Sequence, residues 1–235
     1  MNDPKPYLGN LTAEQTATAM QAARLNAVEL IETADTLFDL KRFPHSVAFS
    51  TLAIEEAGKL PILQNIFLGY DRKVSGDWKS YRQHRAKTEM LNIGILGRIR
   101  AEYPELPLDE AVKIAHNGPT PEELETAKQL SIYSDCLMVS GQFICHLPKN
   151  IDWREQAWKR LCEAKALIIG LRDRTPEELA VWMKHVKAAH NVGKSLIDII
   201  PNVHRELLDK GFIKEGSLDT ILNDIKMTPK HDPKW

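Results

Sequence analysis

The sequence lacks several features that would assign it to a protein class at once. It has only 3 cysteines in 235 residues, and none form a Cys-x-x-Cys pair, so neither a disulfide framework nor a zinc finger is indicated. Its formal net charge of -1 excludes the positive field by which a whole surface attracts nucleic acid. The N-terminus has no basic segment followed by an apolar one, so we expect no signal peptide.

The sequence also lacks a hydrophobic run that would suit a membrane. The most apolar stretch, about residues 130–148, is interrupted by polar and charged side chains, and it predicts a buried helix of a soluble protein. We therefore expect a cytoplasmic protein without membrane contact. Three reduced thiols are expected in that compartment: Cys136, Cys145 and Cys162. No Gly-rich phosphate loop or nucleophile elbow is present, and no cofactor is predicted.

What the sequence does contain is helical periodicity in nearly every segment, with no strand pattern. Thr12 is followed three residues later by Gln15, a combination typical of a capped helix start, and Thr120 and Thr175 are similar starts. The sequence therefore predicts an all-α protein. The expected long helices span about residues 12–40, 44–68, 78–100, 121–145, 152–171 and 175–208, with shorter ones within 103–121 and 217–223.

The second expected helix carries two adjacent carboxylates in otherwise apolar surroundings. Glu55 and Glu56 both share helix faces with apolar residues of the segment 48–67. An unpaired carboxylate in such a setting costs several kcal/mol, so it must be paired, protonated or placed in a cleft. Lys59 is within reach of either glutamate along the helix.

The third expected helix carries a second polar cluster around His84. This histidine lies at the polar edge of a face that becomes apolar downstream, and we expect it to point toward the glutamates. A histidine beside a carboxylate suits acid–base chemistry near neutral pH. Nearby cations could stabilise a phosphate. The predicted catalytic set is Glu55, Glu56, Lys59, His84 and Lys87, and the predicted RNA contacts are Arg82 and Arg85.

Structural roles are the alternative for each of these residues. Glu55 and Lys59 also form an ordinary i,i+4 pair worth a few tenths of a kcal/mol, and His84 could serve packing alone. Tyr133 is expected to be buried with a hydrogen-bond partner. No metal is predicted, because no glutamate is followed three residues later by histidine, as di-iron bundles require, and because Lys59 and Lys87 disfavour a cation.

The combination of these segments resembles a known family. The residues that carry the resemblance are Leu25–Leu30, Ala53–Lys59, His84–Lys87 and Tyr133–Asp135, with Pro148 after a short spacer. They are similar to the AbiV family of abortive-infection proteins, within the HEPN superfamily of helical domains. The match spans about residues 17–150, and Ile-Glu-Glu-x-Gly-Lys is its most specific part.

The resemblance implies a HEPN-like antiparallel helical bundle with additional C-terminal helices. Together with the helical pattern after residue 150, it gives an expected division into residues 1–150 as the HEPN/AbiV-like domain, 151–226 as C-terminal helices packed on it in the same globule, and 227–235 as a flexible tail. It also implies a role in bacterial phage defence, in which an infected cell halts its growth through attack on RNA or translation. Related domains commonly form homodimers with a ribonuclease site at the dimer cleft.

The chain departs from the family pattern at the nuclease motif. HEPN nucleases usually carry arginine, four to six residues, then histidine, and no arginine here has histidine at that spacing. Three functions therefore stay open. The first is a metal-independent ribonuclease with a variant site, His84 acting as acid or base and Lys59 or Lys87 stabilising the transition state. The second is a non-enzymatic module that binds a phage or host protein, such as a phage-encoded activator or a translation component. The third is a nucleotide-binding bundle without catalysis.

Overall fold

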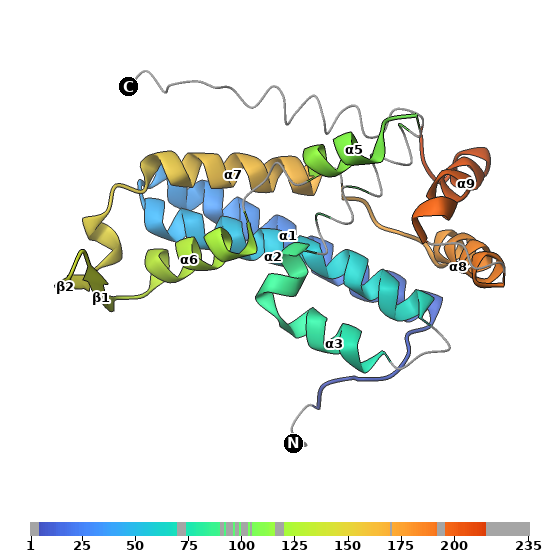
Figure 1. Ribbon diagram of the computed structural model, residues 1–235, viewed down its shortest axis with the longest axis horizontal. Coiled ribbons are helices and arrows are strands. Elements are labelled where there is room, and N and C mark those ends of the chain that lie inside the picture. The colour runs from blue at the N-terminus through green and yellow to red at the C-terminus, as the bar shows by residue number, and fades with distance from the viewer. Residues whose placement is uncertain are drawn as a thin grey trace.

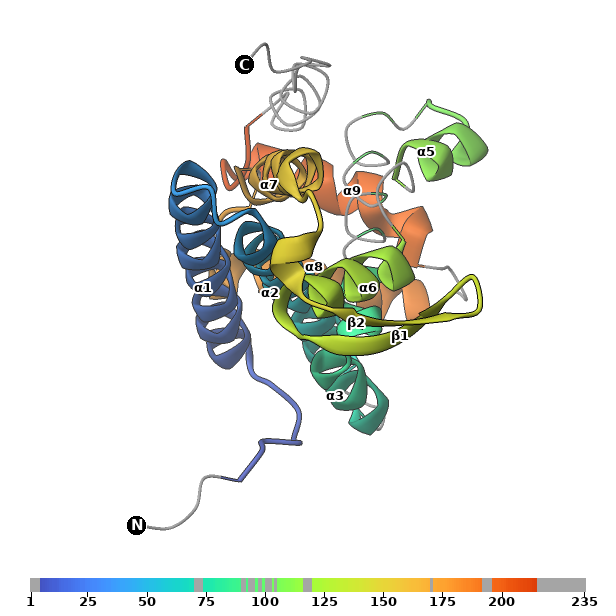
Figure 2. The same cartoon turned by 90° about the vertical axis from the view of Figure 1, so that its left-hand side faces the viewer.

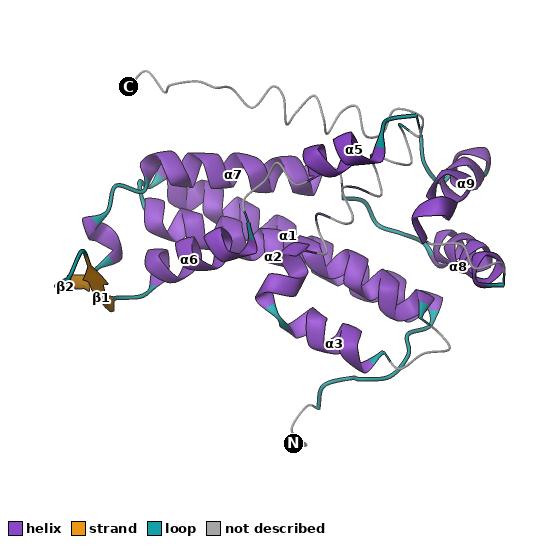
Figure 3. Cartoon of the chain, viewed as in Figure 1, coloured by secondary structure: helices purple, strands orange, loops and turns teal. Residues whose placement is uncertain are grey.

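The chain folds as a helical assembly with one small sheet in the computed structural model (Figures 1 and 3), which confirms the all-α fold class. Across the described ranges, every helix is too short or too polar to serve as a membrane span. The structure describes residues 5–69, 74–89, 92, 96, 99, 103, 105–115, 120–169, 171–191 and 196–214.

A long helical hairpin forms the centre of the fold. Helix α1 (Ala13–Asp39) begins at the predicted capping box, in which the side chains of Thr12 and Gln15 each accept the other's backbone N–H. A short turn leads into α2 (Phe43–Leu68), which packs along α1 (Figure 2). Fully buried alanines lie where the two helices meet, and their small side chains allow close approach: Ala27, Ala34, Ala53 and Ala57.

Helix α2 is enclosed by other helices on most of its circumference. It packs against α1, against α6 (Pro121–Ile132) and against α7 (Arg154–Ile169). Figure 1 shows α6 and α7 beside the half of α2 that follows its N-terminus. A helix that is apolar on all sides is expected to be buried in this way. Glu55, on the enclosed side of α2, is consequently buried in the interior.

The expected helix over residues 78–100 is wrong in one important respect. Helix α3 (Ser75–Arg82) ends at Gln83, whose backbone is extended (φ -92, ψ 126), and a new helical segment begins at His84. The bend lets Trp78 pack into the core beside α2 while the segment after it also contacts α2. Most residues of the expected helix beyond 89 lie outside the described residues.

The expected helix over 121–145 is also wrong, because α6 ends at Ile132 and a β-hairpin follows. Strand β1 (Asp135–Val139) pairs antiparallel with β2 (Gln142–His146). Ser140 and Gly141 have φ of 51° and 78°, the conformation of a two-residue hairpin turn. The stretch expected to be buried is therefore mostly exposed, and so is Tyr133, at 56%.

The remaining elements lie toward the C-terminus and beside the core. Helix α5 (Leu108–Ala115) lies within the predicted connection, and the 3-10 turn η1 (Pro148–Asn150) leads to α7. The single helix expected over 175–208 is two, α8 (Pro176–His190) and α9 (Leu196–Asp209), which pack on each other. The expected short helix at 217–223 and the tail at 227–235 lie outside the described residues.

Candidate functional site

Glu55 is the centre of a buried ionic network on α2. Its side chain is almost fully buried, and each oxygen contacts a basic group. Oε2 lies 2.5 Å from Nδ1 of His84 and 3.5 Å from Nζ of Lys87, and Oε1 lies 2.7 Å from Nζ of Lys128. We call this group, together with Glu125, the Glu55 network. It satisfies the requirement that a buried carboxylate be paired.

Lys128 and Glu125 are the part of the network that α6 contributes. Lys128 Nζ lies 2.7 Å from Glu125 Oε2 as well as from Glu55 Oε1, so one buried ammonium bridges two carboxylates. Burial by itself would lower the pKa of Lys128, but the contacts with Glu125 and Glu55 outweigh it and raise that pKa. Desolvation of Glu125 is likewise outweighed by Lys128, and its pKa is lowered. Lys128 therefore stays charged.

Lys87 reaches Glu55 because the backbone around it rests directly on α2. A Cβ atom at Gly58 would lie 2.0 Å from the carbonyl oxygen of Lys87, so only glycine permits this approach. The Lys87 side chain is buried, and this burial lowers the pKa of its ammonium, an effect that Glu55 partly offsets. The glycine of the most specific family segment thus has a packing role.

His84 is the member of the network that meets solvent. Its imidazole is 52% exposed, whereas the Glu55 carboxylate that it contacts is 4% exposed. With Glu55 ionised, Nδ1 carries the ring proton and donates a hydrogen bond to the carboxylate, which leaves Nε2 as an acceptor. A buried carboxylate that fixes the tautomer and orientation of an exposed imidazole prepares that ring for proton transfer.

The other predicted site residues lie near the network but outside it. Glu56 and Lys59 pair with each other at 2.5 Å, and the Lys59 ammonium lies over the ring of Tyr81 at 5.1 Å. The guanidinium of Arg82 donates to the carbonyls of Trp78 and Tyr7. Arg85 pairs with Glu89 and Glu122. The structure therefore gathers Glu55, His84 and Lys87, while both predicted RNA-contact arginines are already engaged with the protein.

Sequence reasoning missed Lys128 and Glu125 altogether. A signal was available, because Lys128 shares a helix face with Leu124 and Ser131, both buried. A lysine on a buried helix face needs a partner for the same reason as Glu55 does. Glu125, three residues before Lys128, is one of the two carboxylates that pair with it.

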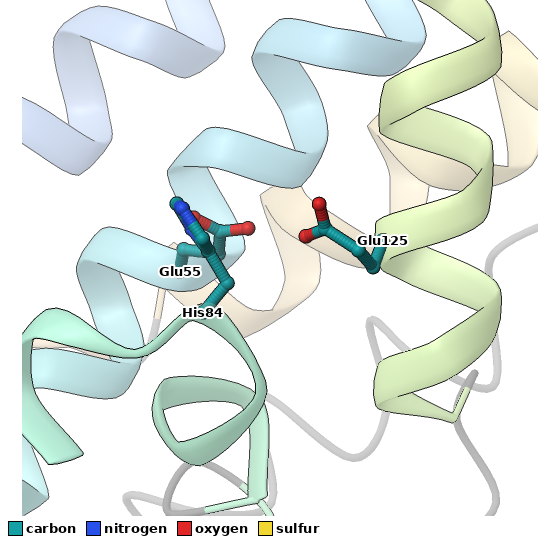
Figure 4. Close-up of side chains that lie close together, drawn as sticks. All are labelled: Glu55, His84 and Glu125. Atoms are coloured by element: carbon teal, nitrogen blue, oxygen red, sulfur yellow. The ribbon is translucent and has the colours of Figure 1, made fainter.

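Three ligand-type atoms of the network lie close enough to suggest a metal site. A ring nitrogen of His84 and one carboxylate oxygen each of Glu55 and Glu125 lie within 4.8 Å of one another (Figure 4). The Lys128 ammonium, however, contacts both carboxylates and supplies the positive charge that a cation would bring. A divalent ion there would have to displace a buried lysine.

The comparison with protein families identifies the chain. The family described as HEPN_AbiV (AbiV) matches residues 15–169. The chain belongs to the AbiV family. The matched region contains the whole Glu55 network and extends past the expected limit to include α7, which shares a core cluster with α1 and α2. Membership links the protein to abortive infection. No curated protein and no solved structure matched the chain.

Proposed function

We propose that this AbiV-family protein is an abortive-infection effector of the cytoplasm that cleaves RNA without a metal ion, with His84 as the group that moves the proton. The observation that carries the proposal is the pairing of a half-exposed imidazole with a buried carboxylate, Nδ1 of His84 lying 2.5 Å from Oε2 of Glu55. This arrangement leaves Nε2 for the substrate. In RNA, the proton to be removed is that of the ribose 2′-hydroxyl, which then attacks the adjacent phosphorus.

We assign two roles to the cations of the site according to their burial. Lys87 and Lys128 are buried against Glu55, with their ammonium groups 3.5 Å and 2.7 Å from its carboxylate oxygens, and they hold this carboxylate in place against the imidazole of His84. Lys59 is more exposed, with 19% of its side chain accessible, and it is the cation we assign to the developing charge on the phosphate.

A homodimer would complete the chemistry. Cleavage of a phosphodiester needs a base for the 2′-oxygen and an acid for the leaving 5′-oxygen, and each Glu55 network supplies one exposed histidine. Two copies that face each other would provide both, as the family resemblance implies for HEPN domains.

A non-enzymatic function is the second candidate, and the tight packing of the network favours it. Gly58 allows backbone contact at residue 87, and two of the basic groups are buried, as expected of a network that fixes helix register. In that case the protein would act by binding a phage protein or a component of host translation, and the network would serve folding.

Expression of a His84→Ala variant, with growth and RNA integrity as readouts, distinguishes these two functions. The matched control is His185→Ala, which removes a different histidine–carboxylate pair, Nε2 of His185 lying 2.9 Å from Glu206 on the α8–α9 side. On expression or phage infection, wild type and the control should arrest growth and degrade RNA, and His84→Ala should do neither while it keeps the wild-type unfolding temperature. Equal arrest and RNA loss in both variants would refute the assignment of His84 as the group that moves the proton. Arrest with intact RNA in the wild type would support the binding function instead.

A further inference from the structure

The β-hairpin brings together two cysteines that are nine positions apart in the sequence. Cys136 on β1 is the direct cross-strand partner of Cys145 on β2. Both residues are exposed, and their thiols are close enough to hydrogen-bond with each other. The helix expected over residues 121–145 would not have paired them, so their proximity is a consequence of the hairpin.

The register of the hairpin places this pair where a disulfide can close. The turn at Ser140 and Gly141 is flanked by the pair Val139–Gln142, which is a hydrogen-bonded pair in a hairpin of this type. Hydrogen-bonded and non-hydrogen-bonded pairs alternate along antiparallel strands, so the cysteines occupy a non-hydrogen-bonded position, where opposite Cα atoms lie about 4.5 Å apart. Disulfides span Cα separations of about 4.4–6.8 Å.

The face that carries the cysteines is open to solvent. Their neighbours on the same face are Met138 and Phe143, which are 68% and 66% exposed. Cys162, in contrast, lies half-buried in α7, where burial raises the pKa of its thiol. A reagent in solution therefore reaches the hairpin pair more readily than the third cysteine.

We propose that Cys136 and Cys145 form an oxidation site, which closes to a cross-strand disulfide by exchange with a low-molecular-weight disulfide. The thiolate of one cysteine attacks a sulfur of the small disulfide, forms a mixed disulfide and releases one small thiolate. The other cysteine, as its thiolate, attacks the protein sulfur of that mixed disulfide and releases the second small thiol. The protein loses two electrons and two protons, and the small disulfide is reduced to two thiols.

The closeness of the two thiols controls both steps. The neighbouring Cys145 thiol raises the pKa of Cys136, so attack by the Cys136 thiolate accelerates as the pH rises. The second attack takes place within the hairpin, between groups already in contact, and it should follow without accumulation of the mixed disulfide. A pair of this kind reacts as a unit.

Intact-mass measurement of a Cys162→Ser variant with glutathione disulfide tests the proposal. This variant keeps only the hairpin pair, and we expect it to lose two hydrogen atoms, carry no glutathione and resist alkylation until a reductant is added. Its single-thiol derivatives, with Cys136→Ser or Cys145→Ser added, should stop at the mixed disulfide. In wild-type protein, peptide mapping should place the same bond between the two strands.

Two outcomes would overturn the proposal. One is a Cys162→Ser protein that stays reduced under conditions in which its single-thiol derivatives take up glutathione. The other is a protein that keeps glutathione on one or both hairpin cysteines without closing the bond. Because the readout is the mass of the protein and not its activity, the result is independent of whether the protein cleaves RNA.

Discussion

Replacement of Gly58 by alanine is expected to disrupt the Glu55 network from a distance, without removing any of its charges. The added Cβ would lie 2.0 Å from the carbonyl oxygen of Lys87, and this neighbour is backbone, which cannot rotate away. To reach the 3.4 Å at which ordinary contact begins, α2 and the segment beginning at His84 must separate by about 1.4 Å. The 2.5 Å contact between His84 and Glu55 would then exceed hydrogen-bond length.

The expected cost follows from two opposing terms. Overpacking of this kind costs about 1–3 kcal/mol, and we take the upper end because backbone must move. The substitution also gains about 1 kcal/mol, since alanine is the better helix former. The net destabilisation is therefore about 2 kcal/mol, which corresponds to a fall of about 4–8 °C in unfolding temperature for a protein of this size.

Gly76 provides a matched control for this experiment. It lies in the first turn of α3, and a Cβ there would meet nothing within 4 Å. Gly76→Ala should therefore be neutral or stabilise the protein by up to about 1 kcal/mol. Urea denaturation of both variants gives the stability difference, and the NMR chemical shifts of the His84 imidazole report whether its contact with Glu55 has survived.

The reasoning would be refuted by a Gly58→Ala protein with wild-type stability. It would also fail if the variant were destabilised while the His84 imidazole kept its wild-type chemical shifts, because the clash would then have been relieved without moving the network. A lowered stability in Gly76→Ala would point instead to a general sensitivity of the helices to alanine.

Two further predictions concern the charges themselves. Glu55→Gln should destabilise the protein by about 3–5 kcal/mol, because it removes the carboxylate that pairs with buried Lys87 and one of the two that pair with buried Lys128. Glu56→Gln should cost no more than about 1 kcal/mol, because its pair with Lys59 is partly exposed. Thermal unfolding that ranks the two variants equally would contradict the assigned burial. Contacts with Lys128 overcome desolvation and lower the pKa of Glu125, so its stabilising contribution is present above the unfolded value of 4.5 and is lost as the pH falls below it. Urea midpoints measured downward from that pH should therefore decline less steeply in Glu125→Gln than in wild type, and parallel curves would exclude this pair as a source of acid sensitivity.

Local signals in the sequence predicted the helix starts well. Thr12, Thr120 and Thr175 all accept the backbone N–H three residues later, in complete capping boxes, because capping depends only on residues within one turn. The predicted proximity of Glu55 and His84 is also confirmed. A charge on an apolar helix face requires a partner wherever the chain folds, so the requirement is visible before the partner is known.

The errors arose where tertiary contacts decide local structure. The run after Ile132 is apolar at helical and strand spacings alike, and the hairpin depends on Ser140 and Gly141 adopting positive φ, which a helical interpretation of the pattern does not consider. No proline or glycine near Gln83 indicates that the helix ends there. The cause of this break is the simultaneous packing of Trp78 and Lys87 on α2, which no single segment reveals.

The geometry also gives different tasks to the adjacent residues of the Glu-Glu-x-Gly-Lys segment. Glu55 and Gly58 are three residues apart and share a helix face. Gly58 leaves room for the backbone of residue 87 to contact α2, and Glu55 then binds the side chains of His84 and Lys87. Glu56 and Lys59, one position further on, pair with each other on the neighbouring face. If the network is what function requires, substitutions at Glu55 and Gly58 should give the same defect as loss of His84, whereas Glu56→Gln should leave His84 in place and change function only if Lys59 itself acts on the substrate.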